Sequence, residues 1–160
     1  MDSQLIHELT PADLRGILKY VPQWRNHIFV ISLDAAVVHD TNFANVLLDI
    51  AVLQNLQVKI VIVYGIGKGI SKLAEKTKTS IQDASGEGPT NAMTLELGIQ
   101  ASGLIANKIM RGLTQAGLKC VQCNALRATK VGIIDGVDQL LRGKVEKIDT
   151  SLLHQLIDEK

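Results

Sequence analysis

Aromatic residues are scarce in this chain, which has two phenylalanines, two tyrosines and one tryptophan among its 160 residues. Hydrophobic residues still make up 46% of the sequence, so valine, isoleucine, leucine and alanine must form the core. Such a composition is typical of buried parallel strands covered by helices. A chain of this length can fold as one domain with a full core, and we therefore expect a single domain over residues 1–160.

An excess of one charge and long apolar runs are also missing. Seventeen Lys and Arg residues face sixteen Asp and Glu residues, and no run of Lys or Arg supplies the basic segment typical of a nucleic-acid binder. Apolar stretches such as Ile60–Val63 are far shorter than the ~20 residues of a membrane span, and Met1–Glu8 lacks the pattern of a signal peptide. We expect a cytoplasmic protein with no nucleic-acid partner and no membrane segment.

The two cysteines, Cys120 and Cys123, form an isolated Cys-x-x-Cys pair. A structural zinc site would need two further ligands at suitable spacing, and the four histidines show no such spacing. The pair lies in a predicted strand, and free cysteines are among the most buried residue types. The sequence therefore predicts reduced, buried or edge cysteines, no metal site and no cofactor.

Apolar periodicity predicts alternating helices and strands along the chain. Helix starts are indicated at Thr10-Pro11, at Thr41 or Asn42, at Asn91, and at Asp149 or Thr150, because these residue types cap or begin helices. The polar, glycine-rich segment Thr77–Thr90 is predicted to be a loop. The predicted strands are Ile28–Leu33, Val58–Val63, Leu118–Val121, Ala128–Ile134 and Lys144–Ile148.

This order of elements implies an α/β fold, a three-layer sandwich in which helices cover a mostly parallel sheet. Asp135-Gly136 is a strong turn signal and predicts a β-hairpin near residues 128–148. The segment Ala92–Ala116 is predicted to be one long helix, in which Gly98, Ser102 and Ala106 share a face. Small side chains there allow another helix or sheet to approach closely, either in the same chain or in a second copy.

The strongest candidate for a binding site is the turn Gly65-Ile66-Gly67-Lys68-Gly69, which follows a predicted strand and begins a predicted helix. Glycines, a lysine and a helix N-terminus can hold a phosphate or carboxylate on backbone N–H groups. The spacing matches neither a P-loop nor a dinucleotide fingerprint. An anion-binding loop and a plain strand-to-helix turn therefore both remain open, with Gly65, Gly67 and Lys68 as the candidate ligand-binding residues.

Asp34 is the other candidate, because it directly follows the predicted strand Ile28–Leu33. Ligand-binding groups in α/β proteins often lie at the carboxyl ends of strands. A solvated loop carboxylate is an equally good interpretation of the same position. The residues alone therefore indicate possible ligand contacts but identify no catalytic group.

Three segments, Phe29–Ala35, Asp49–Leu53 and Val61–Gly65, resemble the opening of the amino-acid kinase family. Further segments resemble N-acetylglutamate kinase and, more closely, N-acetylglutamate synthase, and these are Thr94–Glu96, Val131–Asp138 and Gly143–Asp149. The resemblance covers nearly the whole chain in register. It implies the N-terminal half of the family's domain without the nucleotide-binding half, and a two-fold homodimer built through the long helix.

The departures from the family pattern concern the groups that carry kinase chemistry. The kinases have a lysine where this chain has Ser32, and paired glycines where it has Asp34-Ala35. Kinases and synthases alike usually have an arginine, thought to hold a substrate carboxylate, where this chain has Gly88. Ile66 also places a side chain in the middle of the family's second glycine loop. The resemblance therefore implies a pseudokinase with no catalytic residues.

The resemblance implies a kinase-like regulatory and oligomerisation domain, itself non-catalytic, of an N-acetylglutamate synthase-type amino-acid N-acetyltransferase, a transferase of arginine biosynthesis. Binding of arginine or acetylglutamate is expected to be weak or absent, because the family's arginine pocket lies mainly in the missing half. Two alternatives stay open. One is a divergent N-acetylglutamate kinase that uses Lys68 as its cation, and the other is a stand-alone interaction domain.

Overall fold

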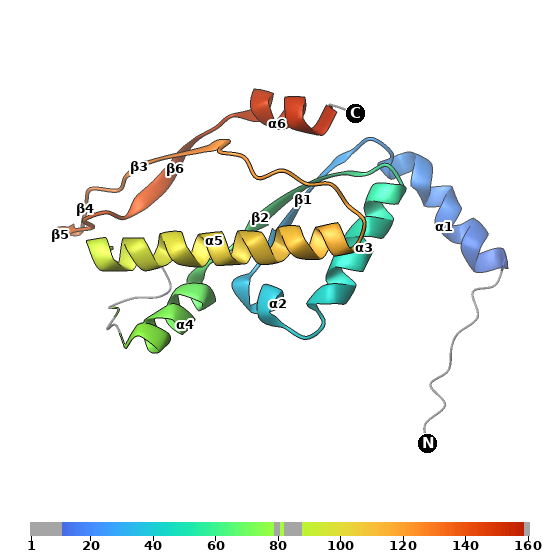
Figure 1. The fold of residues 1–160 in the computed structure, drawn as a ribbon. Coiled ribbons are helices and arrows are strands. Elements are labelled where there is room, and N and C mark those ends of the chain that lie inside the picture. The colour runs from blue at the N-terminus through green and yellow to red at the C-terminus, as the bar shows by residue number, and fades with distance from the viewer. Residues whose placement is uncertain (1–10, 79–80, 82–87, 159–160) are drawn as a thin grey trace, which may run out of the picture.

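A computed structural model describes residues 11–78, 81 and 88–158 of the chain, which form an α/β fold (Figure 1). The helices are α1 (Pro11–Trp24), α2 (Ala35–His39), α3 (Phe43–Asn55), α4 (Gly67–Thr77), α5 (Ala92–Gln115) and α6 (Thr150–Asp158). The strands are β1 (Ile28–Leu33), β2 (Lys59–Tyr64), β3 (Leu126–Lys130), β4 (Ile133–Ile134), β5 (Val137–Asp138) and β6 (Gly143–Ile148). Within these described ranges, no helix is long and apolar enough to cross a membrane.

The centre of the fold is the parallel pair β1 and β2, whose strands run in register and end with Leu33 beside Tyr64. Side chains of a strand point alternately to its two faces. One face, which includes Ile31, packs against the hydrophobic core. On the opposite face, which we call the open face, Val30 is 67% and Val63 is 43% exposed. The pair is thus well buried on one face only, although parallel strands are usually covered on both.

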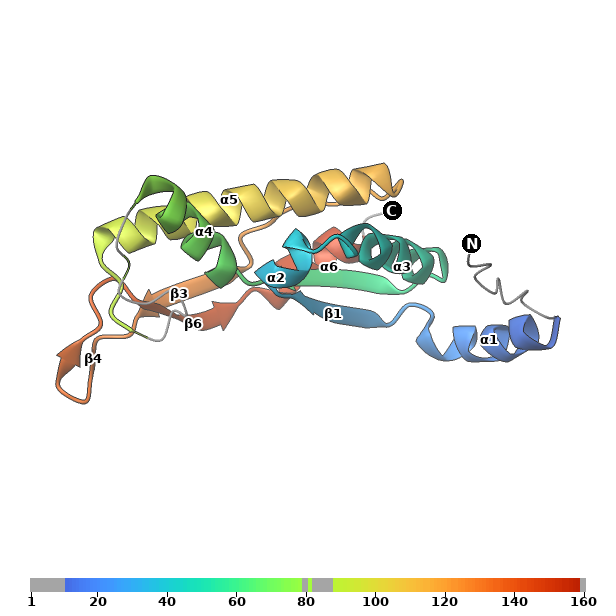
Figure 2. The ribbon, with the colours of Figure 1, turned by 90° about the horizontal axis from the view of Figure 1, so that it is seen from below.

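Helices α2, α3 and α5 lie together on the buried side of β1 and β2 (Figure 2). Gly69 allows α4 to lie close to α5, because a Cβ atom added at this position would be 2.9 Å from the Cδ1 atom of Ile105 and 3.3 Å from the Cβ atom of Ala101. The buried residues of the core cluster are Leu33, Ala35, Val38, Phe43, Leu47, Ile50, Ile105, Ile109 and Leu113.

The small residues on one face of α5 pack against elements of their own chain. A Cβ atom at Gly98 would lie 3.8 Å from the Cδ1 atom of Ile66, and the Ser102 hydroxyl lies 3.3 Å from the Tyr64 hydroxyl. Ala106 is buried. The close packing that these residues predict is therefore present within one chain, where Gly98 and Ser102 are half-buried and Ala106 is buried.

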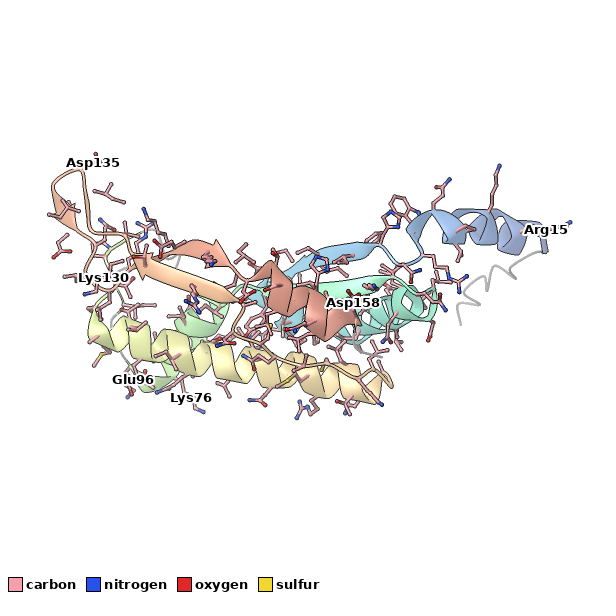
Figure 3. The ribbon with its side chains drawn as sticks, turned by 90° about the horizontal axis from the view of Figure 1, so that it is seen from above. Arg15, Lys76, Glu96, Lys130, Asp135 and Asp158 are labelled. Carbon is pink, nitrogen blue, oxygen red and sulfur yellow. The ribbon has the colours of Figure 1, made fainter. Side chains whose placement is uncertain are left out.

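The remaining strands form antiparallel pairs, β3 with β6 and β4 with β5. The turn between β4 and β5 has positive φ angles at Asp135 (48°) and Gly136 (78°), as a two-residue type I′ turn requires. This confirms the predicted hairpin. Helix α6 then lies on the side of β1 and β2 opposite to α5 (Figures 1 and 3), where Asp158 forms an ion pair with Lys59 of β2.

Two expectations about individual strands are wrong, and the parallel pairing is more limited than expected. The segment Leu118–Val121 is irregular, and the Leu118 N–H instead donates to the carbonyl of Leu113 at the end of α5, at 2.9 Å. The strand predicted over residues 128–134 is interrupted at Gly132, which has a φ of 83°. Among the named strands of the described residues, β1 and β2 pair in parallel and the other two pairs are antiparallel, while a single parallel bridge joins Thr90 and Leu140.

Candidate functional site

The predicted site residues Asp34 and Gly65 lie next to each other because they follow two strands that run parallel and in register. The Gly65 N–H donates to the Leu33 carbonyl at 2.9 Å, which extends the pairing by one residue. A Cβ atom at Gly65 would lie 3.8 Å from Oδ2 and 3.9 Å from Cα of Asp34. A side chain at position 65 would therefore begin in ordinary van der Waals contact with the start of α2.

Asp34 has a local structural function. Its extended backbone makes it the N-cap of α2, and its Oδ1 atom accepts a hydrogen bond from the Ala36 N–H at 2.6 Å. Such a cap satisfies one of the N–H groups that a helix start leaves without a partner. The cap also fixes a carboxylate at the ends of β1 and β2, where its negative charge opposes the binding of a phosphate or carboxylate.

Helix α4 begins two residues after Gly65, with Gly67 as its first residue and an N-cap residue, Ile66, that gives no side-chain hydrogen bond. Lys68 is exposed in the first turn. Gly69 serves packing instead, because its Cα faces Ile105 and Ala101 of α5. The turn thus has a helix start suited to an anion, beside a carboxylate that repels one.

The positions where kinases carry cationic groups are occupied differently. Ser32 is exposed and pairs with Val63 on the open face of β1 and β2. Gly88 comes shortly before Thr90, whose N–H donates to the Gln139 carbonyl at 3.2 Å and whose carbonyl accepts from the Leu141 N–H at 2.9 Å. These bonds fix the segment that precedes α5 onto the region around the hairpin.

An open depression of about 420 Å³ lies at the N-terminus of α5. None of the predicted residues Asp34, Gly65, Gly67 and Lys68 lines it. Sequence reasoning missed this depression because its walls come from α5 and from the hairpin region, which only the fold brings together. Its lining residues are Asn91, Ala92, Lys130, Asp138, Leu140 and Leu141.

The cysteines are not placed as expected. Cys120 and Cys123 are free and exposed in an irregular segment, so the prediction of buried or edge strand cysteines is wrong. Partial desolvation raises the pKa of the Cys120 thiol, which makes it a weaker nucleophile than an ordinary cysteine at neutral pH. Among the residues that the structure describes, no group of three or more His, Cys, Asp or Glu side chains is arranged to hold a metal ion.

A model of the amino acid kinase family matches residues 27–160 of the chain. The chain belongs to the amino acid kinase family. The match includes β1, β2 and the turn between β2 and α4, and it therefore confirms the family resemblance that the sequence motifs indicate.

Curated relatives of this family member are amino-acid acetyltransferases. The one from Mannheimia succiniciproducens is 34% identical over 145 residues, which cover 87% of this chain and 33% of the relative. The one from Aliivibrio fischeri is 31% identical over 150 residues, which cover 88% of this chain and 34% of the relative. The chain thus spans about a third of the length of these relatives.

Solved structures with the same fold include N-acetylglutamate synthase from Neisseria gonorrhoeae. Its structure complexed with coenzyme A and N-acetyl-glutamate matches with a TM-score of 0.81 and 24% identity, over 92% of this chain and 35% of that one. Its structure complexed with coenzyme A and L-arginine matches with a TM-score of 0.77 and 22% identity, over 92% and 37%. These matches confirm the α/β fold class.

Proposed function

We propose that this chain is a non-catalytic, kinase-like regulatory and oligomerisation domain of an N-acetylglutamate synthase-type amino-acid N-acetyltransferase in arginine biosynthesis. The observation that carries the proposal is the Asp34 carboxylate, which caps α2 directly beside Gly65. Phosphoryl transfer needs positive charge around the transferred group. This chain has a carboxylate at the strand ends instead, and its curated relatives are acetyltransferases.

Exposed apolar side chains support the further proposal that this chain is part of a larger kinase-like domain. Val30 on the open face and Ile99 of α5 are 67% and 66% exposed. Apolar surface of this kind marks sites that other protein covers.

A homodimer remains part of the proposal, although Gly98, Ser102 and Ala106 already pack against elements of their own chain. Helix α5 has other apolar side chains for this purpose. Leu95 and Ile99 are one turn apart and are 40% and 66% exposed. Light scattering should find a dimer that Ile99→Gln weakens. A monomer at high concentration would contradict this part of the proposal without affecting the regulatory assignment.

Small-molecule binding is the direct test of the regulatory assignment. The structural neighbour binds L-arginine and N-acetyl-glutamate in its complexes, and we propose that this chain binds such amino acids weakly or not at all. Isothermal titration calorimetry with L-arginine, N-acetylglutamate and ATP should detect no ATP binding. Tight ATP binding would contradict the proposed non-catalytic role, and tight arginine binding would contradict the proposed weak binding of amino acids.

A further inference from the structure

The two cysteines lie in the irregular segment 118–125 between α5 and β3 (Figure 1), which we call the cysteine link. Cys120 and Cys123 are both free and exposed. The cysteine link contains no turn or bend, so neither thiol is enclosed by a loop. Both thiols are therefore open to reagents in solution, and they are three residues apart in the chain.

The cysteine link is anchored at its two ends. The Leu118 N–H donates to the Leu113 carbonyl at 2.9 Å, and the carbonyl of the buried residue Ala125 accepts from the Asp149 N–H at 2.8 Å. Between these anchors, no backbone hydrogen bond joins residues 119–124 to another described residue. The backbone that carries both cysteines can therefore change its φ and ψ angles without breaking a helix or a strand.

A side-chain contact holds the middle of the cysteine link. The Gln122 Nε2 atom donates to the Tyr64 hydroxyl at 3.4 Å, and the same hydroxyl lies 3.3 Å from that of Ser102 in α5. A hydrogen bond of this length is weak. Little therefore opposes a bend of the cysteine link between Cys120 and Cys123.

We propose that Cys120 and Cys123 form a reversible intramolecular disulfide by exchange with a small-molecule disulfide of the oxidised glutathione type. The Cα atoms of a disulfide lie about 4.4–6.8 Å apart, whereas three residues of chain without a bend span up to about 10 Å. Closure therefore bends and shortens the cysteine link. Gln122, which lies between the two cysteines, then leaves Tyr64. This modification site goes beyond the proposed regulatory function and does not depend on it.

The exchange takes place in two steps. The Cys123 thiolate attacks one sulfur of oxidised glutathione, which forms a mixed disulfide and releases one glutathione thiolate. The Cys120 thiol then gives its proton to solvent, and its thiolate attacks the Cys123 Sγ atom and releases the second glutathione thiolate. The chain loses two electrons and two protons, and two molecules of reduced glutathione carry them away.

The order of attack follows from the surroundings of Cys120. Partial desolvation raises the pKa of its thiol, so less of it is thiolate at neutral pH, and the thiolate is the attacking form. Cys123 therefore reacts first with glutathione. Cys120 attacks second, when the mixed disulfide lies only three residues away.

The test is incubation of the reduced 160-residue chain with oxidised glutathione, followed by thiol counting and intact-mass measurement. The two free thiols should fall to none, and the mass should fall by that of two hydrogens. Dithiothreitol should restore both thiols. A glutathione adduct that persists, a covalent dimer on a non-reducing gel, or two unreacted thiols would each overturn the proposal.

Single-cysteine variants separate the two thiols. Cys120→Ser should stop at a stable glutathione adduct on Cys123, because the second attacking thiol is gone. Cys123→Ser should react more slowly with oxidised glutathione, because its remaining thiol has the raised pKa. Equal rates for the two variants, or a faster reaction of Cys123→Ser, would overturn the assigned order of attack.

Gln122→Ala should favour the disulfide, because it removes the contact with Tyr64 that closure breaks. The midpoint of oxidation, given as the ratio of oxidised glutathione to the square of reduced glutathione, should fall about twofold or more. The matched control is Gln100→Ala, which removes an exposed glutamine of α5 and should leave the midpoint unchanged. An unchanged midpoint in Gln122→Ala, or the same shift in both variants, would overturn the proposed release of Gln122.

Discussion

Gly112 of α5 lies so close to Leu47 of α3 that a Cβ atom at position 112 would be 2.2 Å from the Leu47 Cδ1 atom. Leu47 is only 4% exposed, so its side chain has little room to move aside. By contrast, Gly103 of the same helix has nothing within 4 Å of an added Cβ. Close packing therefore requires a glycine at position 112 but not at position 103. The same substitution at the two positions tests this difference.

Gly112→Ala should destabilise the fold, whereas Gly103→Ala should stabilise it. Overpacking in a core costs about 1–3 kcal/mol, while replacing a helical glycine by alanine returns about 0.5–1 kcal/mol. We expect Gly112→Ala to lower the free energy of unfolding by about 1 kcal/mol net, and Gly103→Ala to raise it. Urea unfolding of both variants measures this, and equal effects of the two would contradict the close α3–α5 packing.

The chain should not transfer phosphate from ATP to N-acetylglutamate. An oxyanion-stabilising group is worth about 3–4 kcal/mol, which is roughly a hundred- to a thousand-fold in rate, and kinases carry such a cation where this chain has Ser32. The double variant Ser32→Lys with Gly88→Arg should stay inactive, because the Asp34 carboxylate remains at the strand ends. A coupled assay of ADP release checks both proteins. Substrate-dependent turnover by the wild type would refute the pseudokinase assignment.

His39 should make the fold less stable in mild acid. Its pKa is lowered in the folded state, mainly by partial burial and then by the neighbouring lysines, so the unfolded chain binds the proton more readily. By linkage, the free energy of unfolding then falls as the pH drops through the ordinary histidine pKa of about 6.5. The loss levels off below the lowered, folded-state value.

Denaturant unfolding between pH 7.5 and pH 5 measures this effect. His39→Gln should flatten the histidine-dependent part of the profile in that interval, since glutamine does not titrate. If the wild type and His39→Gln lose the same stability over this interval, then His39 is not the group responsible.

Local sequence signals predicted those elements whose formation depends on neighbouring residues. Asn91 caps α5, and its Oδ1 atom accepts from the Thr94 N–H at 2.8 Å, as its residue type indicates. Asp135-Gly136 makes the expected turn because both residues tolerate positive φ. In contrast, Leu118–Val121 has the composition of a strand but finds no partner strand among the described residues, and strand pairing is a property of the fold rather than of the segment.

The candidate site was predictable only in part for the same reason. The end of a parallel strand is a local signal, and it correctly placed Asp34 and Gly65 at one edge. The Asp34 side chain caps the short helix α2. This cap was not predictable, because the five residues of α2 are too few to give a periodic pattern. The depression at the N-terminus of α5 is lined by residues that are distant in sequence, from Asn91 to Leu141, so no linear motif could reveal it.

Lys59 and Asp158 are 99 residues apart in sequence, and their ion pair joins α6 to β2. Helix α6 contains no fully buried residue, although its apolar side chains are half-buried, and elements without a buried face open at a smaller cost in free energy than the core. In hydrogen-exchange measurements, the amides of α6 should exchange long before those of α5, whose Ile105 and Ile109 are buried.

Asp158→Asn should accelerate exchange in α6 and leave α5 unchanged, whereas faster exchange in both helices would mean that they unfold together. Helix α6 is thus expected to detach locally and reattach, with the Lys59–Asp158 ion pair shifting this equilibrium, while β1, β2 and α5 stay folded.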